Sequence, residues 1–215
     1  GNLIKVSHKE YIDPKELIVE SDWSSASYFF GIVALSEIGS EIRLGAYKKS
    51  SLQGDSVLAD IYRDFGVETS FLNNEIELKK VRRCELETLK CELSNAPDIA
   101  QTIAVSCLGL GMGCELTGLH TLKIKETDRF VAMQTELSKF GVKVTVTDKS
   151  LLLKPTSRLI PEATIDTYND HRMAMAFAPL ALKTSFTIND AGVVSKSYPD
   201  FWGDLNKLGF QLQEV

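Results

Sequence analysis

The chain has 215 residues, 44% of them apolar and 25% charged, which is typical of a folded protein with a sizeable core. A formal net charge of −5 argues against a general nucleic-acid or anionic-membrane surface, because such binding rests on a positive field. No apolar run approaches the roughly 20 residues of a membrane helix, and residues 1–20 lack a signal-peptide pattern, so we expect a cytoplasmic protein. The four cysteines lack the spacing of a disulfide framework or a zinc site, so we expect reduced thiols, no metal and no cofactor.

The first predicted helix covers residues 23–35 and follows Asp22, whose side chain can accept hydrogen bonds from the free amides of a first helical turn. A short strand is expected at residues 41–44. A second, amphipathic helix then ends at Gly66, because glycine suits the left-handed backbone of a helix C-terminus. Alternating apolar residues from Val67 predict a strand with one buried face.

The same order of elements recurs twice more along the chain. Its second copy runs through Asp98, residues 99–110, residues 114–119, Gly141 and Val142. Its third copy runs through Asp170, residues 171–182, residues 185–189, Gly209 and Phe210. Each glycine has apolar residues eight, four and one positions before it: Leu58, Tyr62 and Phe65; Met133, Leu137 and Phe140; Phe201, Leu205 and Leu208.

The intervals from aspartate to glycine are 44, 43 and 39 residues, so we interpret the pattern as a true threefold repeat. Helices that cross between strands make right-handed connections, which bring equivalent helix ends together. Each helix N-terminus carries a partial positive charge, so three of them pointing one way would favour an anionic ligand.

Two charged clusters stand at predicted helix starts. Four of the five residues 125–129 are charged, and Asp170, His171 and Arg172 open another helix. Together they suggest a site that holds anions and moves protons. A solvated helix start would explain the first cluster equally, and a surface ion pair would explain Arg129.

Single residues in these regions leave alternatives open. His171 can shuttle protons near neutrality or be a hydrogen-bonded structural residue. Arg172 opposes the helix dipole, which favours an anionic partner. Asp98 is explained as a helix cap after a proline and equally as a general base, whereas Lys196 is supported only by its place in the repeat.

Four stretches resemble the 5-enolpyruvylshikimate-3-phosphate synthase family, in the family's order and with its intervals. They are residues 122–137 (LKIKETDRFVAMQTEL), 168–177 (YNDHRMAMAF), 22–28 (DWSSASY) and 196–201 (KSYPDF). The resemblance implies a transferase that joins phosphoenolpyruvate to the 5-hydroxyl of shikimate 3-phosphate and releases phosphate in aromatic amino-acid biosynthesis, with no cofactor.

The resemblance also implies an α/β (α+β) fold of two domains, each built from three units of two helices and about four strands, with helices inside and sheets outside. Residues 21–215 would form the C-terminal domain, with repeats at about 21–95, 96–167 and 168–215. Residues 1–20 would be the end of the other domain or a hinge. We therefore expect a fragment that carries half of the active site, is inactive alone, has the N-terminal half as its partner, and is a monomer when complete.

By the same resemblance, Asp98 is the base that accepts the 5-hydroxyl proton, and Glu126 is the proton donor to the methylene of phosphoenolpyruvate. Lys125 contacts shikimate 3-phosphate and relays protons. The cations that hold phosphoenolpyruvate are Arg129, Arg172 and Lys196.

Two positions depart from the family pattern. Thr121 stands where many members place an asparagine that contacts shikimate 3-phosphate, and a hydroxyl cannot offer the pair of hydrogen bonds that an amide offers, so this contact is doubtful. Lys123 replaces a frequent arginine and keeps the charge without the planar fork. The alternatives are a UDP-N-acetylglucosamine enolpyruvyl transferase, an RNA 3′-phosphate cyclase, and a non-catalytic anion-binding module of the same fold.

Overall fold

The computed structural model describes residues 3–214, which contain six α-helices, nine strands and short 3-10 turns. The helices are α1 (Trp23–Leu35), α2 (Leu58–Asp64), α3 (Ala100–Leu110), α4 (Arg129–Ser138), α5 (His171–Phe177) and α6 (Phe201–Lys207). The strands are β1 (Glu41–Gly45), β2 (Val67–Leu72), β3 (Glu75–Lys80), β4 (Thr88–Glu92), β5 (Gly113–Thr117), β6 (Val144–Val146), β7 (Leu151–Leu153), β8 (Ala163–Ile165) and β9 (Phe186–Ile188).

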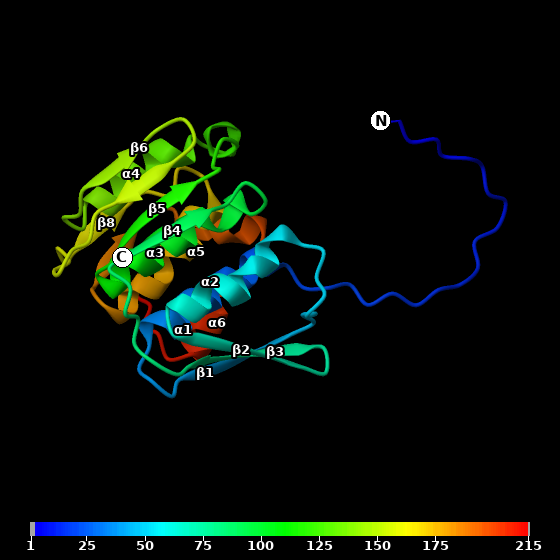
Figure 1. Ribbon diagram of the computed structural model, residues 1–215, viewed down its shortest axis with the longest axis horizontal. Coiled ribbons are helices and arrows are strands. Elements are labelled where there is room, and N and C mark those ends of the chain that lie inside the picture. The colour runs from blue at the N-terminus through cyan, green and yellow to red at the C-terminus, as the bar shows by residue number, and fades with distance from the viewer. Residues whose placement is uncertain (1–2, 215) are drawn as a thin grey trace.

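The strands form three sheets around a helical interior. Their orders are β1-β3-β2, β4-β5-β7-β6 and β8-β9. In Figure 1 the helices α1, α2, α3 and α5 lie between the first sheet and the second, with the sheets outside. The strands β4 and β5 are parallel and are joined through α3, and β8 and β9 are joined in the same way through α5. The predicted α/β arrangement, with helices inside and sheets outside, is confirmed.

The repeat is visible in the sheet topology. The antiparallel order β1-β3-β2 of the first unit recurs as β5-β7-β6 in the second. A strand precedes α3 and α5, but the described residues before α1, 3–22, form no strand, and they lead away from the body (Figure 1). Ser21 nevertheless donates its amide to the carbonyl of Ala46 at 2.8 Å, as Leu93 donates to Thr117 at 2.9 Å.

The interior helices pack closely because small and hydroxyl-bearing residues line their contacts. Ser27 of α1 and Thr102 of α3 share a buried hydrogen bond of 2.9 Å. The hydroxyl of Tyr62 bonds the hydroxyl of Ser106 at 2.8 Å and so links α2 to α3. A side chain at Gly31 would stand 3.4 Å from atoms of a neighbouring helix and of the proline after α5, so this position keeps the helices near one another.

One charged side chain is buried among helix ends. The ammonium of Lys80, which is 3% exposed, donates to the carbonyls of Ala34 and Phe65, each at 2.7 Å. These carbonyls lie at the end of α1 and directly after α2, where a helix leaves acceptors without a partner in its own turn. Lys80 therefore ties the first sheet to two helices.

Most predicted helix ends are confirmed. The glycines at 66, 141 and 209 adopt φ values of 81°, 85° and 92°, the left-handed conformation expected at helix C-termini. Asp22 accepts the amides of Ser24 and Ser25, and Asp170 accepts the amide of Arg172, so both aspartates are N-caps.

Three expectations need correction. Asp98 does not cap α3: it lies in a 3-10 turn, Pro97–Ile99, and its side chain is drawn to nearby cations instead. Residues 210–214 form no strand, because within residues 3–214 the third sheet offers only the β8–β9 pair and nothing pairs with them. Leu208 is 44% exposed and does not complete the apolar face of α6.

Element ends also shift by a few residues. The strand expected to reach residue 119 ends at Thr117, and the helix expected over 171–182 is α-helical only to Phe177, after which a 3-10 turn begins before Pro179. Among residues 3–214, no helix is long and apolar enough to span a membrane, and no group of three or more His, Cys, Asp and Glu side chains is placed to hold a metal.

Candidate functional site

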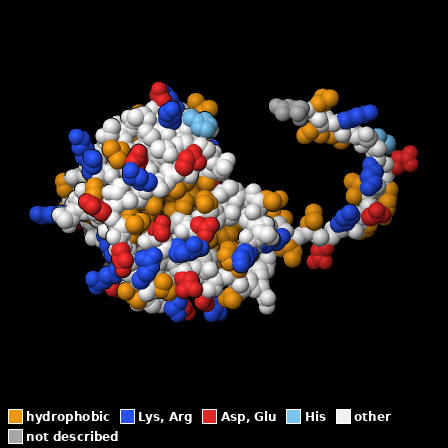
Figure 2. Space-filling model, viewed as in Figure 1, with side chains coloured by type: hydrophobic (Ala, Val, Ile, Leu, Met, Phe, Trp, Pro, Cys, Tyr) orange, Lys and Arg blue, Asp and Glu red, His pale blue; other side chains and the backbone are white. Residues whose placement is uncertain are grey.

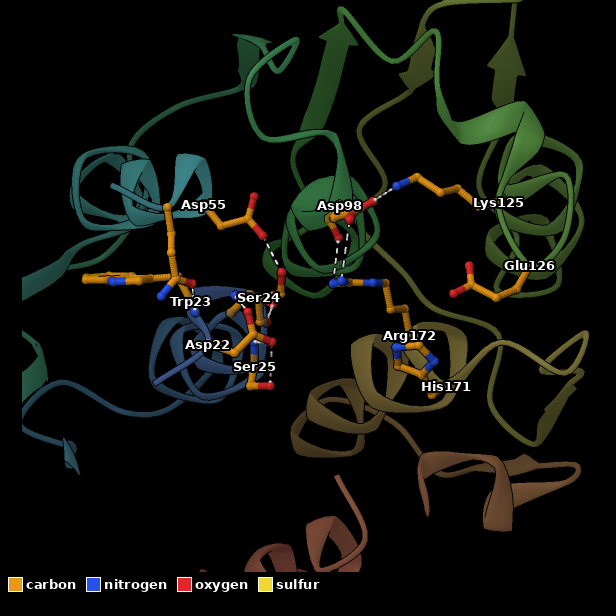
Figure 3. Close-up of polar contacts among 12 residues, drawn as sticks. Asp22, Trp23, Ser24, Ser25, Asp55, Asp98, Lys125, Glu126, His171 and Arg172 are labelled. Atoms are coloured by element: carbon orange, nitrogen blue, oxygen red, sulfur yellow. Dashed lines mark hydrogen bonds and ion pairs between the residues drawn. The ribbon is translucent and has the colours of Figure 1, made fainter. Parts of the chain in front are cut away.

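Asp98 is the meeting point of three cations from two other segments. Figure 3 shows two of them, Lys125 and Arg172. Its Oδ1 lies 2.9 Å from Nζ of Lys125 and 3.0 Å from Nη1 of Arg129. Its Oδ2 lies 3.5 Å from Nη2 of Arg172. Partial burial alone would raise the pKa of Asp98, but Arg172, Lys125 and Arg129 outweigh it and hold that pKa below its usual value. Asp98 is therefore an ionised acceptor at neutral pH.

Arg129 is the buried centre of the charge network, with 1% of its side chain exposed. Its Nε donates to Oδ2 of Asp170 at 2.6 Å, and Nη2 donates to Glu126 Oε2 at 2.7 Å. With Asp98 on Nη1, all three nitrogens of the guanidinium have a carboxylate partner. A buried guanidinium needs such partners, because an unpaired buried charge is very costly.

Glu126 stands at the open side of this network. Its side chain is 41% exposed, whereas Asp170 is fully buried. Partial burial would raise the pKa of Glu126, but its own backbone amide and the charges of Arg129, His171 and Arg172 outweigh this and lower the pKa. Without a ligand, the predicted proton donor is therefore held in its ionised form.

The first turn of α5 supplies two more site residues. Arg172 reaches from this turn to the backbone carbonyl of Asp98 at 3.4 Å as well as to its carboxylate. His171 has a buried Nδ1 with no hydrogen-bond partner among the described residues. Burial lowers the pKa of His171, and the carboxylate of Asp170 only partly offsets this, so the imidazole is neutral near pH 7.

We call the ion pairs among Asp98, Lys125, Glu126, Arg129, Asp170 and Arg172 the Asp98 network. Within the described residues, Lys196 and Thr121 make no hydrogen bond or ion pair with its members. The ammonium of Lys196 donates to the carbonyl of Asn169 at 2.8 Å and to its side-chain oxygen at 2.7 Å. Asn169 in turn lines an open hollow of about 560 Å³ with Asp190, Gly192 and Val193. The hydroxyl of Thr121 is buried and has no partner within residues 3–214. The binding roles of both residues stay predictions.

The helix starts converge as the repeat predicts. Figure 3 shows Ser24 of α1, Asp98 before α3 and Arg172 of α5 facing one another around a common space. The Asp98 network borders this space and is open to solvent, since Asp98 keeps 27% of its side chain exposed. Figure 2 shows mixed charges rather than a positive field over the visible face. The visible face therefore offers no broad positive surface.

One carboxylate beside the site, Asp55, escaped the sequence reasoning, and the ion pair of another, Asp170, was not predicted. Asp55 accepts a hydrogen bond from Ser24, and burial raises the pKa of Asp55 although the charge of Arg172 partly offsets this. The sequence signal for Asp55 is its position in the repeat: it directly follows Gln53 and Gly54, which correspond in the first unit to Lys125 and Glu126 in the second. Asp170 is predicted as a helix cap and as a member of the second charged cluster, but its pairing with the buried Arg129 cannot be seen from spacing.

The repeated helix–strand units and the cationic network at their helix starts define a domain of the enolpyruvyl transferase class. A sequence profile of the EPSP synthase (3-phosphoshikimate 1-carboxyvinyltransferase) family matches residues 1–205. The chain belongs to this family.

Known relatives agree on the family and on the length that is covered. A 3-phosphoshikimate 1-carboxyvinyltransferase of Bacteroides fragilis (strain YCH46) is 44% identical over 198 residues, which are 91% of this chain and 48% of the relative. One of Vibrio atlanticus is 38% identical over 93% of this chain and 46% of the relative. The chain thus spans about half the length of the curated relatives it matches.

Solved structures show the same fold at low sequence identity. An EPSP synthase from Acinetobacter baumannii aligns with a TM-score of 0.76 at 23% identity, over 91% of this chain and 47% of that one. The enolpyruvyl transferase NikO from Streptomyces tendae aligns with a TM-score of 0.66 at 16% identity, over 92% of this chain and 45% of that one. Both likenesses concern the fold alone.

Proposed function

We propose that this chain forms one wall of an active site that transfers the enolpyruvyl group of phosphoenolpyruvate to the 5-hydroxyl of shikimate 3-phosphate and releases phosphate. The observation that carries the proposal is the Asp98 network, in which a general-base candidate, an acid candidate and three cations from separate segments adjoin one another. Membership of the family supports the same reaction.

The residues suit the two halves of an addition and elimination. In the addition, Glu126 gives a proton to the methylene carbon of phosphoenolpyruvate, the 5-hydroxyl oxygen bonds to the neighbouring carbon, and Asp98 accepts the hydroxyl proton. In the elimination, the new methyl group returns a proton to Glu126, the bond from carbon to the phosphate oxygen breaks, and the phosphate leaves with the proton that Asp98 accepted. Each proton transfer by a placed group contributes roughly 10²- to 10⁴-fold to the rate.

The cations have matching tasks. Phosphoenolpyruvate carries a carboxylate and a phosphate close together, so planar guanidinium forks such as Arg172 and Arg129 and the ammonium of Lys196 are suitable partners. Nζ of Lys125 lies 2.9 Å from Oδ1 of Asp98, which supports a role for Lys125 in contacting shikimate 3-phosphate and in relaying the proton that Asp98 accepts. The opposite wall, which would close over both substrates, belongs to the half that this chain does not span.

The test is phosphate release from phosphoenolpyruvate in the presence of shikimate 3-phosphate. We expect little or no turnover by this chain alone, and turnover after fusion to the N-terminal half of the Bacteroides fragilis relative. Glu126→Gln or Asp98→Asn in the fusion should lower the rate roughly 10²- to 10⁴-fold. Robust turnover by the chain alone would refute the half-site, and a fusion whose turnover ignores both substitutions would refute the assigned roles.

A further inference from the structure

Arg129 is proposed to hold phosphoenolpyruvate, yet every nitrogen of its guanidinium already has a carboxylate partner. An incoming anion can reach this guanidinium only by replacing one of them, because 1% of the Arg129 side chain is exposed. The three carboxylates differ in how firmly they are held. That difference decides which one leaves.

Asp170 is the firmest partner. It is fully buried, receives Nε of Arg129 at 2.6 Å, and also caps α5 through the amide of Arg172 at 2.9 Å. Displacing it would leave a buried carboxylate and a helix end without partners. Asp98 is held by Lys125 and Arg172 as well as by Arg129, so it too is anchored from several sides.

Glu126 is the partner that can leave. Its side chain is 41% exposed, and Arg129 is the one cation within ion-pair distance of its carboxylate among the described residues. Its bond to Nη2 of Arg129 lies at the solvent-facing end of the network, where a ligand would arrive. Glu126 gives up one ion pair when it swings into solvent, where water can solvate its carboxylate, and the arriving anion takes over the pairing with the buried Arg129.

We propose that Glu126 is a displaceable placeholder: an anionic group of phosphoenolpyruvate takes its position on Nη2 of Arg129, and the freed carboxylate then takes up a proton from the buffer acid in the surrounding solution. This step rests on the proposed function and explains how that function acquires its acid. The proton joins the carboxylate to give the carboxylic acid, and the same proton is then available to the methylene carbon. Glu126 is therefore protonated, and able to act as the acid, only when phosphoenolpyruvate is bound.

The surroundings of Glu126 support the direction of this change. On its own segment it faces Arg129 and follows Lys125; from α5 it faces His171 and Arg172. Once Arg129 pairs with the ligand, the closest cation no longer favours the ionised form, and the ligand's own negative charge opposes it. His171 is neutral near pH 7 and does not replace the lost cation.

The experiment measures phosphoenolpyruvate binding and proton uptake by calorimetry in buffers of different ionisation enthalpy, with the fusion to the N-terminal half described above and with its Glu126→Gln variant. We expect the wild type to take up close to one more proton per bound ligand than the variant does at pH 7. Because the variant has no carboxylate to displace, it should bind about tenfold more tightly. Glu126→Ala should behave like Glu126→Gln.

A matched control is Asp60→Asn, which removes an exposed pair of the same spacing and length, 2.7 Å, between Asp60 and Arg63 of α2. It should bind phosphoenolpyruvate as the wild type does. Equal proton uptake by wild type and Glu126→Gln, or tenfold weaker binding by both Glu126 variants, would overturn the exchange while leaving the proposed function in place. No binding by any of the folded proteins would overturn both.

Discussion

Replacing Asp170 by alanine should destabilise the chain more than removal of an ordinary helix cap. Asp170 is fully buried and does two things: it caps α5 through the amide of Arg172 and pairs with Nε of Arg129. Loss of an N-cap costs about 1 kcal/mol. Removing one partner of a buried ion pair costs about 3 to 5 kcal/mol, because the other charge stays buried. Asp98 and Glu126 still pair with Arg129, so we expect a total near the lower end, about 3 to 4 kcal/mol.

Asp22 provides the control, because it caps α1 through the amides of Ser24 and Ser25 and has no buried arginine as a partner. Asp22→Ala should cost about 1 kcal/mol in urea unfolding. A cycle with Arg129→Leu isolates the ion pair: the double variant should be more stable than the sum of the two single losses predicts, by about 2 to 3 kcal/mol. An Asp170→Ala loss no larger than that of Asp22→Ala would refute the reasoning.

Three further predictions concern other parts of the chain. Lys80→Met should lower the free energy of unfolding by about 2 to 3 kcal/mol, since two buried carbonyls lose a charged donor, whereas the exposed neighbour Lys79→Met should cost under about 0.5 kcal/mol. The pKa values of Asp98 and Glu126 are lowered in the folded chain, so the stability that these carboxylates contribute is present above their unfolded pKa values and is lost as the pH falls below about 4. In acid unfolding followed by circular dichroism, the free energy of unfolding of Asp98→Asn should therefore depend less steeply on pH than that of the wild type. When the chain is fused to an N-terminal half, residues 16–20 should pair in parallel with the open edge of β1, as β4 pairs with β5. The amide hydrogens of residues 16–20 should then exchange slowly with solvent. Rapid hydrogen exchange there would contradict the equivalence of the units.

The sequence predicted the repeat because its signals are local. An aspartate before an apolar helix and a glycine after one need only their own neighbours, and Asp22, Asp170 and all three glycines behave as expected. The strand after Gly209 failed for a non-local reason: a strand needs a partner, and alternation of Phe210 and Leu212 says nothing about whether one is available. The expected burial of Leu208 was wrong for the same reason, because no sheet within residues 3–214 covers that end of α6.

The site was predictable in its residue types but not in its pairing. Lys125, Glu126 and Arg129 were found as an excess of charge, and Arg172 as a cation at the wrong end of a helix dipole. That Asp98 would leave its cap position to join them depends on which helix starts become neighbours in space. The burial of Arg129 is likewise invisible along the chain, where it resembles an exposed first-turn residue.

The charge balance of the Asp98 network predicts the charge of the opposite wall of the proposed active site. Three carboxylates, those of Asp98, Glu126 and Asp170, face three cations, those of Lys125, Arg129 and Arg172. Together they are neutral, and Asp55 nearby adds a further acidic group. A neutral wall cannot attract two phosphorylated carboxylates by its own field. Either the network gains protons as the ligands arrive, as Glu126 does in the exchange proposed above, or the opposite wall brings the positive charge. Protonation of Glu126 offsets only one of the several negative charges that the two substrates carry, so we expect the other half of the active site to be strongly cationic.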